Sequence, residues 1–275
     1  MLRSSDWPLQ WPLAGVLLAA ALYHLGGRAR ETRTAARRSA AFYGGLLALA
    51  VAVDSPVDAY ADSLFAAHMV QHVLLTLVAP PLLVLGRPWP RLARPLPLRL
   101  RRPATRAAFG VLPRGVVDRI AAPLPAFALF NGVLLSWHLP ALYDLTLRSE
   151  PVHLCEHALF FATGLLFWRH LVPTSARPRL GDGGRAVYGT AALLVGWLLA
   201  VVLGLAPDPV YSAYASLPHR PGGISALADQ QLAAGIMWVP ASIPVTVATL
   251  VAAYRWLDPK RRRPRVAEDL RPRET

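Results

Sequence analysis

The amino-acid sequence predicts an all-α protein that crosses a membrane several times. Of its 275 residues, 54% are hydrophobic and only 16% are charged, with a mean hydropathy of +0.36, whereas a soluble domain usually carries more charge. Several apolar runs reach about 16 to 22 residues, the length that crosses a hydrocarbon core ~30 Å thick. Most of the basic residues lie between these runs, as they do in the loops of membrane proteins.

Seven such runs follow one another along the chain, with no additional soluble domain visible between them. The first run precedes its arginines, unlike the apolar part of a cleavable signal peptide, so we expect it to remain as a span. The third run contains Pro80 and Pro81, and the seventh contains Pro240 and Pro244; these prolines free backbone carbonyls within their helices. The predicted spans are residues 8–26, 39–54, 62–86, 123–142, 151–170, 186–206 and 229–256, and residues 257–275 form a basic cytoplasmic tail.

The connections between these runs alternate between arginine-rich and arginine-poor. In chain order they carry five arginines, none, nine (residues 87–122), one, four (residues 169–185) and one, and the tail is again basic. Because positively charged loops stay on the cytoplasmic side, we expect the N-terminus outside and the C-terminus inside. The net charge of +13, distributed in this way, indicates contact with membrane lipids and not with nucleic acid.

Five of the eight histidines fall in the outer layer of the predicted bundle. His68 and His72 lie near the start of the third span, His153 and His157 repeat the four-residue spacing in the fifth, and His138 stands at the outer end of the fourth. Residues four apart share one helix face, and a polar side chain within lipid usually faces the bundle interior and has a function. The spacing predicts that the two pairs meet at one metal, with His138 either a further ligand or an interfacial residue.

Acidic and sulfur-bearing side chains lie near the same layer. Glu156 and Asp229 could each accept an imidazole N–H and so fix its tautomer, or contact water as interfacial acids. Met237 could supply a soft sulfur ligand, whereas Met69 and Cys155 point away from their neighbouring histidines on a regular helix and are expected to pack. Imidazole suits zinc, copper, iron and nickel, so these residues leave the metal open.

Four segments, in this order, resemble one known family. "HMVQHVLLTLVAPPLLVLG", "SWHLPALYD", "HLCEHALFFATGLLFW" and "DQQLAAGIMWVP" resemble the CtaG family of cytochrome c oxidase assembly factors, the seven-span type found with caa-type oxidases in bacteria. The resemblance implies a multi-pass protein of the bacterial plasma membrane that helps to mature the oxidase, with oxidase subunits as partners and copper as the suspected metal. The motif residues that carry over by position are His68, His72, His138, His153, Glu156, His157 and Asp229.

The leading interpretation is therefore a non-enzymatic metallochaperone that holds copper at the outer face. A protein with haem b between two histidines is the alternative, and a zinc site is a further one. A metal transporter would need polar residues in the inner halves of the spans, where the sequence offers none comparable. A membrane metalloprotease is disfavoured because its HExxH motif is absent. The sequence is also compatible with a homo-oligomer.

Overall fold

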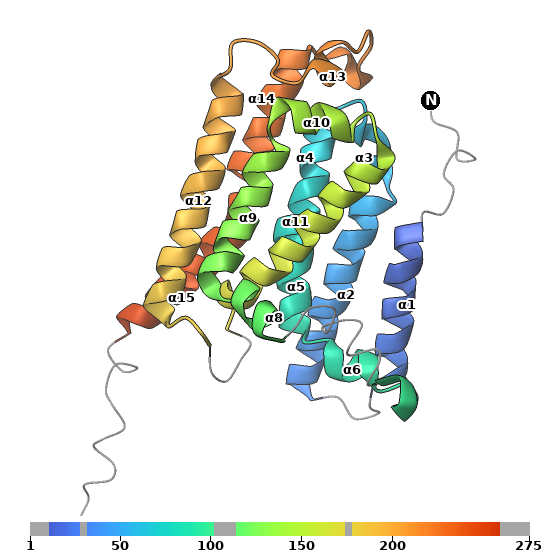
Figure 1. Ribbon diagram of the computed structural model, residues 1–275, viewed down its shortest axis with the longest axis vertical. Coiled ribbons are helices and arrows are strands. Elements are labelled where there is room, and N and C mark those ends of the chain that lie inside the picture. The colour runs from blue at the N-terminus through green and yellow to red at the C-terminus, as the bar shows by residue number, and fades with distance from the viewer. Residues whose placement is uncertain (1–10, 28–31, 102–113, 174–177, 259–275) are drawn as a thin grey trace, which may run out of the picture.

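The regular elements of this protein are helices. The computed structural model describes residues 11–27, 32–101, 114–173 and 178–258, and no strand occurs among them, as the sequence predicted. Figure 1 shows the longer helices running side by side, with α10 and α13 at one end of the bundle and α6 and α8 at the other. The α-helices are α1 Trp11–Leu25, α2 Arg33–Val53, α3 Pro56–Ala61, α4 Phe65–Val73, α5 Ala79–Gly86, α6 Trp89–Ala93, α8 Arg114–Ile120, α9 Pro123–Trp137, α10 Pro140–Thr146, α11 Glu150–Leu171, α12 Asp182–Leu205, α13 Ser212–Ala215, α14 Ala226–Trp238 and α15 Ser242–Leu257.

Four helical stretches of the described chain are long and apolar enough to cross a membrane. They are Arg33–Ala61, Phe65–Gly86, Asp182–Leu205 and Ala226–Leu257. The bent pair α9 and α10 would make a fifth. Helix α11 has the length of a span, 22 residues, but its three histidines and two glutamates make it less apolar. Helix α1 is a shorter apolar helix.

The fourth predicted span is not one continuous helix. Helix α9 ends at Trp137 and α10 begins at Pro140, and the two axes differ by 79°. Proline has no N–H to continue the helix, and it pushes the preceding residue out of the helical region; Leu139 accordingly has φ −66° and ψ 130°. The prediction of a single helix over 123–142 was wrong because Pro140 turns the chain, and the turn leaves His138 as the C-terminal cap of α9.

The third predicted span is interrupted below its histidines. A π-helix, Leu74–Val78, separates α4 from α5, and Pro80 cannot donate a hydrogen bond to the carbonyl of Thr76, one turn earlier. The indole Nε1–H of Trp168, on α11, donates to that carbonyl at 3.0 Å. A Cβ atom on Gly164 would lie 3.0 Å from the same oxygen. The freed carbonyl that the sequence predicted is thus satisfied by α11, which approaches the third span closely at this point.

The interrupted third span lies at the centre of the bundle. Helix α2 packs against α5, α14 against α4, and α11 against both α5 and the π-helix. A core of aromatic side chains, Phe65, Tyr143, Tyr211 and Tyr214, fills the end of the bundle that carries α10 and α13. These contacts surround the helix turns that carry the two histidines of α4.

The hydrogen bond from Trp168 gives a test of this arrangement. Replacing Trp168 by phenylalanine keeps an aromatic ring but leaves the Thr76 carbonyl buried without a donor. We expect the free energy of unfolding to fall by about 1–3 kcal/mol, measured as a lower thermal midpoint of the purified protein in detergent. Trp238→Phe, at a half-exposed position on α14, is the matched control. Equal midpoints for the two variants would contradict a supporting role for this bond.

Candidate metal centre

The two histidine pairs face one another across α4 and α11. The ring centroids of His68 and His153 are 5.0 Å apart, and those of His72 and His157 are 5.6 Å apart. Within the pairs the separations are 4.4 Å on α4 and 4.1 Å on α11. Four imidazoles from two helices therefore form one compact group, as their spacing in the sequence suggested.

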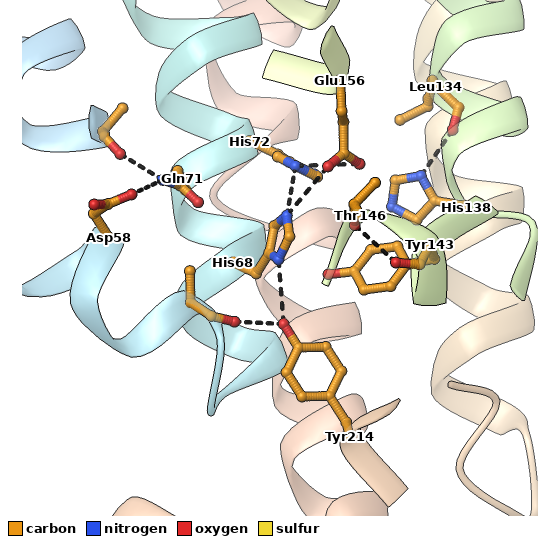
Figure 2. Close-up of polar contacts among 12 residues, drawn as sticks. Asp58, His68, Gln71, His72, Leu134, His138, Tyr143, Thr146, Glu156 and Tyr214 are labelled. Atoms are coloured by element: carbon orange, nitrogen blue, oxygen red, sulfur yellow. Dashed lines mark hydrogen bonds and ion pairs between the residues drawn. The ribbon is translucent and has the colours of Figure 1, made fainter. Parts of the chain in front are cut away.

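Glu156 lies inside this group and not behind it. Its carboxylate oxygens are 3.6 Å from His68 Nε2 and 3.5 Å from His72 Nε2, and Figure 2 shows the carboxylate beside both rings. The side chain is fully buried, and neither oxygen has a hydrogen-bond partner among the described residues. Burying a carboxylate is costly unless a hydrogen-bond donor or a cation compensates it.

A metal ion would fit the donor set of this group. One ligand atom from each of four residues, His68, His153, Glu156 and His157, lies within 4.8 Å of the other three. The Nε2 atoms of His153 and His157 are buried and without a hydrogen-bond partner in the described part of the chain. A cation among these atoms would supply the interaction that the lone pairs and the carboxylate lack.

The tautomer of His68 follows from its partners on the opposite side. The Tyr214 hydroxyl donates to the carbonyl of Ala61 at 2.5 Å, and the same hydroxyl oxygen is 3.2 Å from His68 Nδ1. Because a carbonyl only accepts, the hydroxyl hydrogen is used there, and Nδ1–H of His68 donates to the hydroxyl oxygen. The Nε2 atom of His68 then carries a lone pair toward the group, which is the form that binds a metal.

His72 stands at the edge of the group. Its Nε2 is 2.9 Å from His68 Nε2, and two lone pairs cannot meet at that distance, so His72 donates its Nε2–H to His68. The Nδ1 atom of His72 consequently carries a lone pair, and it is buried without a partner among the described residues. His72 is also absent from the set of four ligand atoms within 4.8 Å. It lies beside that set, and the Nδ1 side of its ring is directed away from it.

His138 is oriented inward and not toward the membrane surface. It is 6% exposed, and its ring centroid lies 6.3 Å from that of His72. Its Nδ1–H donates to the carbonyl of Leu134 at 2.7 Å, so Nε2 carries the lone pair; this atom too is buried without a partner in the described chain. The structure thus places His138 inside the protein, and its role as a metal ligand stays a prediction.

Asp229 is placed differently from the sequence-based hypothesis. Its carboxylate accepts from the backbone N–H groups of Phe65 at 2.7 Å and Ala66 at 3.0 Å. Helix α4 has no side-chain cap of its own, and a carboxylate at a helix N-terminus satisfies the free N–H groups and the helix dipole. Asp229 does not accept from an imidazole; it holds the start of the helix that carries His68 and His72.

The sulfur-bearing side chains separate into two environments. Met69 and Met237 both line a cavity of about 80 Å³ that also contacts His72 and His138. Met69 was expected only to pack, so its place beside these histidines is a difference from the prediction. Cys155 is exposed.

Several residues at this centre were missed by the sequence reasoning. Gln71 donates from Nε2 to the carbonyl of Ala52 at 2.7 Å and to Asp58 Oδ1 at 2.6 Å, which ties α4 to α2 and α3. Tyr143 is fully buried, with its ring centroid 5.1 Å from that of His68. A glutamine between two histidines, and tyrosines in a predicted outer loop, were the available signals. Neither signal showed toward which helix these side chains would point in the folded protein.

The other three histidines lie away from the cluster. His170 is bonded from Nε2 to the carbonyl of Ala121 at 3.0 Å, which explains its burial. His24 and His219 are exposed.

Comparison with known proteins gives one family. The model of a family described as cytochrome c oxidase caa3 assembly factor matches residues 19–258. An uncharacterized protein of Mycobacterium bovis is 28% identical over 229 residues, which are 82% of this chain and 35% of that protein. One from Mycobacterium leprae is 26% identical over 231 residues, 80% of this chain and 34% of its own length. The chain thus spans about a third of these relatives. No solved structure matches it.

The role of Asp229 can be tested separately from any metal. In Asp229→Asn the side chain keeps its shape, but its NH2 group replaces one of the two carboxylate oxygens. One of the two backbone N–H groups then faces a donor and loses its acceptor. We expect the free energy of unfolding to fall by about 1–3 kcal/mol, seen as a lower thermal midpoint, together with faster hydrogen exchange at the amides of Phe65 and Ala66. The control is Asp208→Asn, an exposed acid in the loop after α12. Unchanged exchange at both amides would contradict the capping role.

Proposed function

The chain belongs to the family of cytochrome c oxidase caa3 assembly factors, and from this membership we propose that it binds copper at the cluster of His68, His153, Glu156 and His157 and helps to supply it to the oxidase. The observation that carries the proposal is the set of four ligand atoms from α4 and α11 within 4.8 Å of one another. The oxidase is the expected partner, and the role is assembly and not catalysis.

We infer that the chain crosses the plasma membrane of a bacterium seven times, through α1, α2, α4–α5, α9, α11, α12 and α14–α15. Connections rich in arginine meet at the end with α6 and α8, and the connections at the end with α10 and α13 contain few (Figure 1). The positive-inside rule then makes the α6 end cytoplasmic. Many large apolar side chains of α12 and α15 are exposed, among them Leu198, Leu205 and Leu250, as lipid-facing residues are.

This orientation puts the cluster in the outer half of the membrane. The start of α4, where His68 lies, is close to α13, because Tyr214 of α13 contacts His68. The cation would thus be held near the outer surface, on the side where exchange with an extracytoplasmic copper site of the oxidase is feasible.

The ligand chemistry fits copper and agrees with the family. Imidazoles suit copper, zinc, iron and nickel alike, so the choice of copper rests on the link to the oxidase. Glu156 would offset the charge of the ion in a buried position. The bound ion would be cargo and not a resident cofactor. The Nε2 atom of His68 would be one of its ligands, because Tyr214 fixes the His68 tautomer that leaves a lone pair on this nitrogen.

The haem alternative is disfavoured by the space available. The imidazoles of α4 and α11 are packed ring against ring, with centroids 5.0 and 5.6 Å apart. The adjoining cavity of about 80 Å³ is well below the roughly 300–1,000 Å³ of sites for large ligands. A purified sample without a Soret absorption band would agree with this reading, and a strong band would overturn it.

The predicted topology can be tested by cysteine accessibility. In a Cys155→Ser background, Ser216→Cys lies beside α13 and Leu98→Cys lies beyond α6; both positions are exposed. We expect an impermeant maleimide to label Ser216→Cys in intact spheroplasts and to label Leu98→Cys only after permeabilisation. The reverse pattern would show the opposite orientation. Labelling of both positions without permeabilisation would place them on the same face of the membrane, and it would contradict an odd number of spans between Leu98 and Ser216.

The metal site can be tested by replacing its ligands. His153→Ala and His157→Ala should lose copper that the unaltered protein retains through dialysis, because each removes one of the four ligands. Cells that carry either variant should show reduced oxidase activity at unchanged protein level. Tyr214→Phe removes the acceptor of His68 Nδ1–H and also the donor to the Ala61 carbonyl, and it should weaken metal affinity by about 10–100-fold.

His24→Ala, at an exposed position on α1, is the matched control and should retain copper and activity. If His153→Ala, His157→Ala and His24→Ala retain equal copper, the cluster is not the binding site. If His153→Ala and His157→Ala lose bound zinc but retain as much copper as the unaltered protein, the cluster would be assigned to zinc and not to copper.

A further inference from the structure

A cavity adjoins the cluster on the side of α9, α12 and α14. It is about 80 Å³ in volume, and Met69, His72, Thr76, His138 and Met237 contribute to its wall. We propose that this cavity is a second metal site, selective for a soft monovalent cation such as Cu(I), and that it shares the His72 ring with the cluster. The inference extends the proposed function by dividing the copper path into two sites of different chemistry.

Two imidazole lone pairs are available to the cavity. The Nδ1–H of His138 is used by the Leu134 carbonyl, so its Nε2 is the basic nitrogen. The Nε2–H of His72 is directed at His68, 2.9 Å away, so its Nδ1 is the basic nitrogen. Both basic atoms are buried and have no hydrogen-bond partner among the described residues. The two rings, 6.3 Å apart between centroids, both contact the cavity.

His72 thus connects the two sites through its two nitrogens. The neutral ring has one hydrogen, and the contact with His68 and Glu156 assigns it to Nε2. This is the tautomer that leaves Nδ1 free for a metal on the cavity side. Figure 2 shows His72 beside Glu156, with His68 below both and His138 on a separate helix. The cavity is therefore preorganised for binding while the cluster is metal-free.

Two sulfur atoms complete the donor set. Met69, which is 1% exposed, and Met237 belong to the same hydrophobic cluster as Leu203 and Ala233, and both reach the cavity. The chain has three methionines, so two of them adjoin one cavity that also holds two free imidazole nitrogens. Thioether sulfur prefers Cu(I) to harder ions, and imidazole accepts it.

The charge of the wall also favours a monovalent ion. None of the described residues that line the cavity is an aspartate, glutamate, lysine or arginine, and most of the wall is apolar. The cost of burying an ion rises with the square of its charge, so a site of neutral ligands selects a single charge over a double one. The cluster differs, because Glu156 supplies a carboxylate there. The two sites are accordingly expected to differ in their preference for Cu(I) over divalent ions.

The test uses silver, a redox-stable monovalent ion, and the three methionine methyl groups. The full chain carries Cys155→Ser, to remove an exposed thiol, and is labelled with ¹³C at the methionine methyls. On titration with Ag(I) in detergent, the signals of Met69 and Met237, assigned with Met69→Leu and Met237→Leu, should shift together. The signal of Met1 should not move, and a shift of this signal would indicate nonspecific binding of silver.

Variants separate the two sites. In His138→Ala the shifts of both methionine signals should be lost while silver still binds the cluster. In His153→Ala the methionine shifts should persist. Because Met69→Leu could perturb packing, Met237→Leu, at a partly buried position, provides an independent variant in which the Met69 shift should require at least tenfold more silver.

The possible outcomes distinguish the second site from the proposed function. Silver bound without any shift at Met69 or Met237 overturns the second site and leaves the cluster intact. Methionine shifts that survive His138→Ala overturn the assigned donor set. Shifts abolished by His153→Ala would show a single site and not two. No binding of silver or copper by the unaltered protein would overturn both this inference and the proposed function.

Discussion

The contact between α11 and the interrupted third span is the constraint on which the centre depends. Pro80 deprives the Thr76 carbonyl of its helical donor, and Trp168 supplies the replacement at 3.0 Å. A buried carbonyl without a donor is costly, so this bond favours one register of α11 against the third span. One turn above Thr76 lies His72, and three turns above Trp168 lies His157. A register set by one hydrogen bond thereby brings the two histidine pairs face to face.

Helix α4 is held by polar contacts with four neighbouring helices, α14, α2, α3 and α13. Asp229 of α14 caps its first N–H groups, Gln71 bonds to α2 and α3, and Tyr214 fixes the His68 ring. None of these groups needs to touch a metal. Each determines where a ligand stands or which nitrogen carries its hydrogen, which is the part that supporting residues play around metal-binding histidines. The polar residues of this end act as one framework.

Electrostatics divides the interior into two regions. Around Glu156 a buried carboxylate lies among four imidazoles, a set that favours a cation because no other group compensates the carboxylate. On the far side of His72 the cavity presents only neutral donors, among them Met69, Met237 and His138. Membership of the family of oxidase assembly factors is the ground on which copper is proposed. The division into a charged and a neutral environment is a property of this chain.

The sequence by itself determined the helical class, the break at Pro80 and the pairing of histidines on common faces, because periodicity and proline chemistry act within one helix. Only the tertiary structure decided that Glu156 enters the cluster, that Asp229 caps α4, that His138 turns inward at the bend before Pro140 and that Met69 and Met237 line one cavity. These depend on the rotation and register of helices far apart in sequence, which packing and hydrogen bonds between helices set and which no local pattern encodes.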